Sequence, residues 1–378
     1  MDPVFYKAAA DGRMEAFEHT DYPLDFFRTV GNNTILHIYA TSLIKESEST
    51  TAFVKAILCK CRSLLWETNN KGETPLYLAA RYGHVSIVNC LIEHAKIDLP
   101  QDLESGIQAA RKMLRITNKK KDTALHEAVR QNQLAVVLLL LKEDPDFSYS
   151  ANDAGETPLY LAIERNFGDV ALKILESCGS PSYGGPLGRT ALHAAVIRHD
   201  NGMIGELLKR FGDLSKKADQ NGWIPIHFAA FFDSTISARL LLEADRQAAY
   251  MKDIAGMTAL QIAAHRGNNS VMETIISRCP DCCELVDNRG WNVLHFAIDG
   301  RGGKETVGVI LKYSSLSNLL NEEDFDGNTP FHHQSNSKDI EEDLMDHPRV
   351  DKMAFNKLNL AGRDITLLGA KSPEKKIS

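Results

Sequence analysis

A short pattern that recurs at a nearly constant interval is the feature that most constrains the fold of this chain. It is a glycine-led turn, then Thr or Pro, a large apolar residue and small apolar residues, as in GETPLYLA, which occurs at both 72–79 and 155–162. Copies begin at Gly31, Gly72, Lys121, Gly155, Gly188, Gly222, Gly256, Gly290 and Gly327. Between Lys121 and Gly290 the steps are 34, 33, 34, 34 and 34 residues. This period predicts stacked units that bury their apolar faces only against one another.

Each residue type in the pattern has a local role. Gly tolerates the positive φ of a tight turn, Thr is a good helix N-cap, and Pro fits the first helical position. The Leu and the paired alanines that follow form the buried face of an inner helix, and an apolar segment such as 86–95 forms a second helix. We therefore expect an all-α repeat solenoid of about nine to ten repeats over residues 31–368.

The two steps before Lys121 are 41 and 49 residues, which indicates insertions. The polar, Ser/Thr-rich segment 41–53 is expected to be an exposed extension between two helices. Segment 94–118 contains LESGIQAARKML, which is expected to add a helix. Segment 177–186 is rich in Gly, Pro and Ser, which predicts a loop and a soft joint in the array.

The two ends of the chain depart from the repeat pattern. Residues 1–30 are expected to form N-terminal capping helices. Residues 321–351 contain ten acidic and two basic residues, which predicts a degenerate, acidic capping region. The polar tail 369–378 is expected to be disordered.

Composition limits the class of protein. The net charge of −7 over 378 residues does not favour wholesale binding to nucleic acid or to acidic membranes. Seven scattered cysteines, an odd number, favour a reducing compartment, so we expect a cytoplasmic location. The N-terminus lacks the apolar run of a secretory signal. The longest apolar run, 134–141, is well short of the ~20 residues of a membrane span, so this chain is expected to contain none.

Candidate catalytic and metal chemistry is sparse. One repeat position carries a histidine in His37, His126, His193, His227, His295 and His332. Tyr77, Tyr160 and Gln261 replace it elsewhere, which favours a structural hydrogen-bonding role over metal binding. Cys279 and Cys282 have a CxxC spacing, but no second CxxC completes a zinc site. Phosphate-loop, dinucleotide, GxSxG and HExxH motifs are absent, so we expect no catalytic site, cofactor or metal.

The variable positions around the pattern predict a partner-binding surface. Arginines and aromatic residues recur at the ends of the inner helices and at the turns, and these residue types dominate interface hot spots. The candidate contacts are Arg81, Tyr82, Arg130, Arg165, Arg189, Arg198, Trp223, Phe231, Phe232, Arg266, Arg289 and Trp291, with Lys71, Lys119 and Lys120 at the turns. Such a face would suit an acidic or phosphorylated segment of a protein partner. Arginine is also favoured at a helix C-terminus by the helix dipole, so solvated surface remains the alternative interpretation.

The period and the TPLHxA-like signature resemble the ankyrin repeat over nearly the whole chain. NNKGETPLYLAARYGH, NEEDFDGNTPFH and HPRVDKMAFNKLNLAG are also similar to the plant ankyrin–transmembrane (ankyrin–PGG) family. This resemblance implies a cytosolic ankyrin array that regulates immunity, salicylic-acid signalling and cell death through protein contacts. In that family a PGG domain with membrane helices follows the array. Its motif does not occur here, which leaves either the ankyrin part of a longer chain or a short soluble form.

Three functions remain open at this stage. The first is a non-enzymatic interaction scaffold, located at the cytosolic face of a membrane if a longer form carries a membrane domain. The second is a partner-recruiting subunit of an enzyme complex such as a ubiquitin ligase or a kinase. The third is a soluble form that competes with membrane-bound relatives. Self-association is compatible with each of them.

Overall fold

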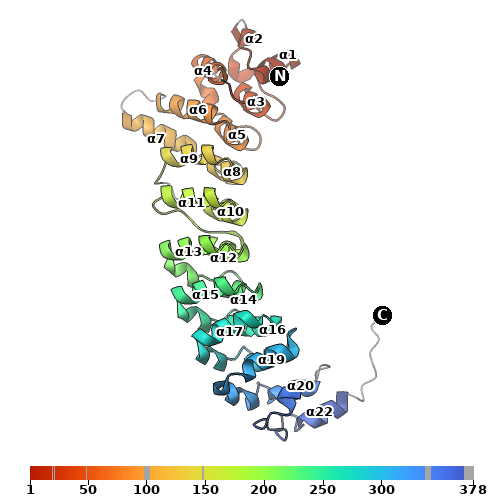
Figure 1. Cartoon of the computed structure of the whole chain (residues 1–378). Helices are drawn as coiled ribbons and strands as arrows, with labels where there is room; N and C mark the ends of the chain where they lie inside the picture. Colours follow the sequence, from red (N-terminus) through yellow and green to blue (C-terminus); the bar gives the residue numbers. More distant parts are fainter. Residues whose placement is uncertain are drawn as a thin grey trace. The chain divides into compact units, whose positions relative to one another are not determined.

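The computed structural model describes residues 1–18, 20, 22–47, 49–97, 103–146, 149–336 and 342–369. Regular structure in these ranges is helical, apart from isolated bridge residues, which are Gly184, Thr190 and the antiparallel pair Phe355 and Ala361. The chain divides into two compact units, Met1–Leu187 (unit 1) and Gly188–Ser378 (unit 2). Each unit is described by itself, with the labels of Figure 1.

Unit 1 consists of paired helices in two rows. The inner row is α3 (Ile35–Ser42), α5 (Pro75–Tyr82), α8 (Ala124–Arg130) and α10 (Pro158–Glu164). The outer row is α4 (Thr50–Lys60), α6 (Val85–Ile97), α9 (Leu134–Glu143) and α11 (Gly168–Ser177). Each helix packs on the next in its row, and α1 (Pro3–Asp11) packs on α3. The short helices are α2 (Glu15–Glu18), η1 (Leu24–Phe26) and η2 (Arg62–Leu65).

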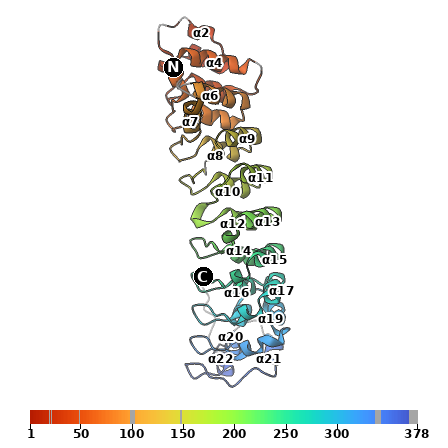
Figure 2. The same cartoon turned by 90° about the vertical axis from the view of Figure 1, so that its left-hand side faces the viewer.

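Unit 2 repeats this arrangement. Its inner row is α12 (Ala191–Ile197), α14 (Pro225–Phe231), α16 (Ala259–Arg266), α18 (Val293–Asp299), α20 (Pro330–Asn336) and α22 (Gly362–Gly369). Its outer row is α13 (Asn201–Arg210), α15 (Thr235–Ala244), α17 (Asn269–Arg278), α19 (Gly303–Leu311) and α21 (Glu342–Met345). The 3₁₀ turns are η3 (Pro186–Gly188), η4 (Gly212–Lys216), η5 (Arg246–Tyr250), η6 (Pro280–Glu284) and η7 (Ser314–Asn321). In Figure 2 the hairpins before its inner helices lie along one side of the unit.

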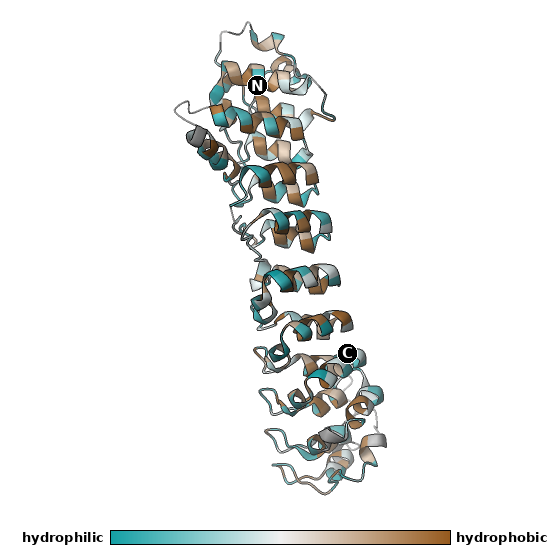
Figure 3. Cartoon of the chain, turned by 60° about the vertical axis from the view of Figure 1, so that its left-hand side comes forward, coloured by the Kyte–Doolittle hydropathy of each residue, from teal (hydrophilic) through white to brown (hydrophobic). Residues whose placement is uncertain are grey.

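The sequence pattern explains how each inner helix begins and what it buries. In α5 the Thr74 side chain accepts a hydrogen bond from the Tyr77 backbone N–H (3.2 Å), and Pro75 follows at the first helical position. Leu76 and the paired alanines after it are buried against the neighbouring helices. Figure 3 shows hydrophobic residues concentrated on the helix pairs, as expected for units that share their cores.

An Asn or Asp side chain organises most of the hairpins, although not those before α3 and α12. Before α14, Asp219 Oδ1 accepts hydrogen bonds from the backbone N–H groups of Asn221 (2.8 Å) and Trp223 (2.9 Å). The same pair of bonds forms at Asn69, Asn118, Asn152, Asp253, Asp287, Asp324 and Asn356. Sequence reasoning missed this role. The available signal is an Asn or Asp three residues before the turn glycine, as in Asp219 and Gly222.

The recurrent histidine joins one repeat to the next. In α12, His193 Nδ1 accepts from the Thr190 backbone N–H (3.0 Å), so Nε2 carries the proton and donates to the Trp223 carbonyl (2.9 Å). Equivalent Nε2–carbonyl bonds are made by His37, His126, His295 and His332. The histidine thus has the structural role expected from the sequence.

The tyrosines of the two GETPLYLA copies make different links at the same position. The Tyr77 hydroxyl donates to Glu127 (3.0 Å) and accepts from Asn118 Nδ2 (3.0 Å), so it bridges to the following repeat. Loop 178–185 packs on the ring of Tyr160. A Cβ atom on Gly185 would lie only 2.1 Å from that ring, which explains the glycine at this point of the loop.

The insertions correct the sequence-based boundaries in two places. Residues 50–53 do not extend into solvent but begin α4, because Phe53 is buried against Tyr39, with ring centroids 4.7 Å apart. Residues 94–97 belong to α6. The later part of the second insertion forms an additional helix, α7 (Leu103–Leu114), which packs on α6. After α7, Arg115 forms a bidentate ion pair with the buried Asp144 at the end of α9 (2.7 and 2.9 Å).

The remaining predicted segments lie at unit boundaries and at the chain ends. The division into units falls at Leu187, directly after loop 178–185. Within 321–351 the structure describes α20 and α21, and Phe331 of α20 is buried. Residues 370–378 of the predicted tail lie outside the described residues. None of the helices described has the length and apolar character needed to cross a bilayer.

Replacing Gly222 by Ala is expected to destabilise unit 2 by roughly 2 kcal/mol. Gly222 has φ +77°, and a Cβ atom there would lie 2.8 Å from the backbone nitrogen of Ile254 in the next hairpin. Gly205, an exposed glycine within α13 with no atom within 4 Å of its Cβ position, provides the matched control. Gly205→Ala should stabilise by about 0.5–1 kcal/mol. Urea unfolding of both variants checks this pair, and equal stabilities would contradict it.

Candidate partner-binding surface

In unit 1, two of the predicted contact arginines are engaged in ion pairs within the protein. Arg81 bonds to Glu73 (2.7 Å) and Glu127 (2.9 Å). Arg130 bonds to Asp122 (2.9 Å) and to the other oxygen of Glu127 (2.6 Å). We call these five residues the charged floor. Glu127, which is 4% exposed, therefore lies between arginines from two neighbouring repeats.

The electrostatics of Glu127 follow from these contacts. Burial by itself would raise the pKa of the Glu127 carboxyl, but the hydrogen bond from Arg81 and the charges of Arg81 and Arg130 lower it. The carboxylate is consequently held ionised, and it fixes both guanidinium groups in place. Arg81 and Arg130 are positioning residues of the inner face, and much of their charge is neutralised.

A groove of about 880 Å³ lies above the charged floor. Its sides are the hairpins that precede α5, α8 and α10. Lys71, Lys119 and Lys120, which we call the lysine rim, stand exposed on the first two of these hairpins. The groove thus combines a floor of ion-paired arginines and carboxylates with a rim of exposed lysines.

In unit 2, several predicted residues gather at one place. The aromatic–arginine cluster consists of Trp223, Phe228, Phe231, Phe232 and Arg266. The ring centroid of Phe231 lies 5.5 Å from that of Trp223 and 5.1 Å from that of Phe232. The Arg266 guanidinium lies 4.2 Å from the Phe231 centroid, within the range of a cation–π contact. Phe232 is 42% exposed, so this cluster reaches the surface.

The cluster is held by its neighbours in the array. Trp223 Nε1 donates to Asp253 in the next hairpin (3.0 Å), and the Arg189 guanidinium lies 5.0 Å from the Phe228 centroid. Phe231 is half-buried under Arg266, while Phe232 faces solvent. The two adjacent phenylalanines, equivalent from sequence alone, therefore have different roles.

The other predicted residues lie apart from these two groups. Tyr82 is exposed and stacks on His84, with centroids 6.1 Å apart. Arg165 and Arg198 are exposed C-cap residues of α10 and α12. The Arg289 guanidinium lies 3.8 Å from the Trp291 ring centroid and pairs with Asp287 (2.8 Å). The arginines of the sequence pattern therefore differ in their surroundings, since some pair with carboxylates, some cover aromatic rings and others are exposed.

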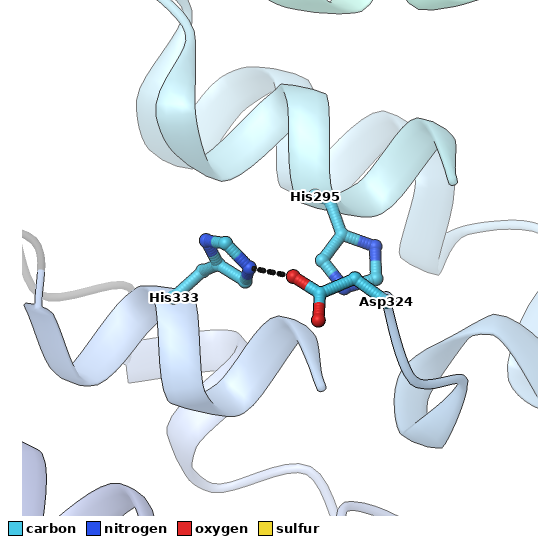
Figure 4. A group of neighbouring side chains, drawn as sticks. All are labelled: His295, Asp324 and His333. Carbon is cyan, nitrogen blue, oxygen red and sulfur yellow. Dashed lines mark hydrogen bonds and ion pairs between the residues drawn. The ribbon is translucent and has the colours of Figure 1, made fainter. Parts of the chain in front are cut away.

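One group of side chains has the composition of a metal site. Ligand atoms of His295, Asp324 and His333 lie within 4.8 Å of one another (Figure 4). However, His295 Nδ1 accepts from the Asn292 N–H (3.2 Å) and Nε2 lies 3.2 Å from the Asn328 carbonyl, as in the other repeats. His333 Nε2 bonds to Asp324 (2.9 Å). A metal would have to displace these bonds, so the geometry fits packing better than metal binding.

Comparisons with known proteins agree with the repeat architecture. The family described as ankyrin repeats (3 copies) matches residues 6–102, 43–148 and 104–184. The ankyrin repeat domain of Bcl-3 superposes with a TM-score of 0.53 at 24% identity, covering 64% of this chain and 100% of that domain.

Two curated plant proteins are similar in sequence. Protein ACCELERATED CELL DEATH 6 of Arabidopsis thaliana is 26% identical over 185 residues, which is 47% of this chain and 26% of that protein. The E3 ubiquitin-protein ligase KEG, also of Arabidopsis thaliana, is 24% identical over 306 residues, covering 63% of this chain and 18% of the ligase. The chain thus spans about a quarter or less of the length of these relatives.

A stack of ankyrin repeats explains both the matches and the structure. It accounts for the helix pairs and for the histidine and hairpin bonds that join successive repeats. Stacked ankyrin repeats typically present a surface to protein partners and carry no catalytic site of their own. The chain has the fold of an ankyrin-repeat array.

Proposed function

We propose that this chain is a non-catalytic scaffold that holds a protein partner on the aromatic–arginine cluster of unit 2. The observation that carries the proposal is the exposed Phe232 beside Trp223, Phe231 and Arg266. Aromatic residues and arginine supply most of the binding energy at protein interfaces, where a few buried anchors dominate. Here the next repeat fixes Trp223 and Phe231 in advance, so little side-chain entropy would be lost on binding.

We infer that the cellular role is regulation of plant immunity and cell death from the cytoplasm. The similarity to ACCELERATED CELL DEATH 6 supports this inference. The odd and scattered set of seven cysteines favours a reducing compartment. In a longer form with a membrane domain, the array would lie at the cytosolic face.

A second candidate is recruitment of substrates to an enzyme complex. The similarity to a ubiquitin ligase over 306 residues favours it. Both candidates use the same surface and differ in what else is captured, since a recruiting subunit would co-purify with the catalytic chain of a ligase or a kinase.

The test is quantitative co-purification from plant tissue with the full chain and with Phe232→Ala/Arg266→Ala. Loss of hot-spot contacts of about 2 kcal/mol should reduce capture of a direct partner by roughly 30-fold. Ile236→Ala, which truncates another exposed apolar side chain on outer helix α15 (48% exposed), is the matched control and should retain the partner. Equal capture by all three proteins would refute the assignment of this surface.

A further inference from the structure

The lysine rim is a second charged feature of the array, separate from the aromatic–arginine cluster. Lys71 and Lys119 are on neighbouring hairpins that are joined directly, because the Lys119 backbone N–H donates to the Lys71 carbonyl (2.9 Å). Lys120 is the next residue, and its carbonyl accepts from the Asp153 N–H of the third hairpin (2.9 Å). Three lysines are therefore held close together by backbone hydrogen bonds.

None of these three lysines forms an ion pair within the part of the chain that the structure describes, although acidic side chains also line the groove. Lys121, by contrast, pairs with Asp153 (2.8 Å). Three neighbouring ammonium groups repel one another in a region that remains partly screened by water. An incoming anion would relieve this repulsion.

The charged floor beneath the rim holds three carboxylates, of Glu73, Asp122 and Glu127, against the two guanidinium groups of Arg81 and Arg130, so both arginines are already paired with carboxylates and the anion is directed to the rim lysines. Arg130 also lies 3.7 Å from Glu156, and Asn152 Nδ2 donates to both Asp122 (2.8 Å) and Glu156 (3.0 Å). These bonds fix the floor in one arrangement. The volume of about 880 Å³ above it lies in the range of small-ligand and short-peptide sites.

We propose that the groove of unit 1 binds an extended acidic segment of a protein partner, with aspartate or glutamate side chains placed on Lys71, Lys119 and Lys120. Lysines suit this task because each is a separate point charge on a flexible stem, which can follow carboxylates spaced along a chain. The third hairpin lines the groove with Asn152, Asp153, Ala154 and Glu156 and adds no cation to it, so the acidic run lies over the first two hairpins. This inference rests on the proposed protein-binding function but uses a different surface.

The experiment measures fluorescence anisotropy of the full chain with a labelled peptide of alternating aspartate and glutamate. Lys71→Glu/Lys119→Glu/Lys120→Glu reverses the rim. Lys60→Glu/Lys112→Glu/Lys142→Glu makes the same change of net charge at exposed lysines of unit 1 outside the groove. The rim variant should weaken binding at least about 30-fold and the control less than about threefold, with affinity falling as salt is raised. Circular dichroism checks that both variants keep their helix content.

Three outcomes would overturn the proposal. Equal weakening by both variants would indicate attraction to net charge alone. Equal binding of the matching asparagine–glutamine peptide would show that carboxylates are not recognised. Binding only of a phosphoserine peptide of the same charge would assign the rim to phosphate instead. The co-purification test uses residues of unit 2, so a failure of the peptide experiment does not contradict the scaffold function. If co-purification fails instead, the peptide experiment still tests the groove of unit 1 by itself.

Discussion

Lowering the pH from 7.5 to 5 is expected to destabilise unit 2 by about 4 kcal/mol, about 2 kcal/mol from each of two buried histidines. Burial lowers the pKa of His193 and of His295 to about 4, from an ordinary value of 6.5. The hydrogen bonds that Nε2 donates to backbone carbonyls raise the pKa, but burial has the larger effect. Both rings are neutral in the folded protein at pH 5, whereas they are protonated in the unfolded chain.

The sign follows from proton binding. Between pH 6.5 and 4 the unfolded state binds more protons, so stability is full above 6.5 and falls as the pH is lowered through this window. Carboxyl groups with a lowered pKa, such as that of Asp324, affect stability at a lower pH than the two histidines do. Burial would raise the Asp324 pKa, but hydrogen bonds from His333 and from backbone N–H groups lower it, so its contribution is lost only below the ordinary carboxyl range.

The chain itself suggests the control for this experiment. At the same repeat position Gln261 Oε1 accepts from the Thr258 N–H (2.8 Å) and Nε2 donates to the Trp291 carbonyl (3.1 Å). His193→Gln/His295→Gln should therefore keep the links and remove the titration of these two rings. Opening free energies from amide hydrogen exchange in α12 and α18 should fall steeply as the pH is lowered in the unmodified protein and less steeply in the variant, which retains His227, whose pKa is also lowered by burial. Equally steep profiles would show that other groups cause the loss.

Replacing Glu127 by Ala is expected to destabilise unit 1 by about 3 kcal/mol. The substitution removes one carboxylate partner from each of Arg81 and Arg130 and the acceptor of the Tyr77 hydroxyl. All of these groups are wholly or partly buried, so water replaces the lost bonds poorly. Links among α5, α8 and the hairpin between them would weaken together.

Glu176→Ala is the matched control. Glu176 pairs with Lys173 within α11, and its side chain is 61% exposed, so the change should be below about 0.5 kcal/mol. Urea unfolding combined with hydrogen exchange in α5 and α8 distinguishes the two variants. A loss below about 1 kcal/mol for Glu127→Ala would mean that the remaining carboxylates, of Glu73, Asp122 and Glu156, suffice to hold the arginines.

The functional surface was only partly predictable from the sequence. Arg81 and Arg130 lie nine residues after Gly72 and Lys121, the first residues of their repeats, whereas Arg165 lies ten residues after Gly155. The sequence prediction grouped the three arginines as one surface without using this one-residue offset. The shared partner of Arg81 and Arg130 is Glu127, which is 46 residues from Arg81 and lies in the next repeat. The second partner of Arg81 is Glu73, the acidic residue directly before the capping Thr74. An acidic residue eight positions before the arginine, as in Glu73 and Arg81 or Asp122 and Arg130, is a signal in the sequence for such a pair.

The sequence by itself determined the ankyrin architecture, because the turn glycine, the capping Thr, the first-turn Pro and the Leu and Ala of the inner helix all act within one repeat and recur at a fixed period. It also predicted the linking role of the histidine. Only the tertiary structure decided which cations remain available to a partner and which aromatic side chains reach the surface. Those properties depend on neighbours from other repeats, as when Glu127 neutralises Arg81 and Arg266 covers Phe231, and stacking alone brings such residues into contact.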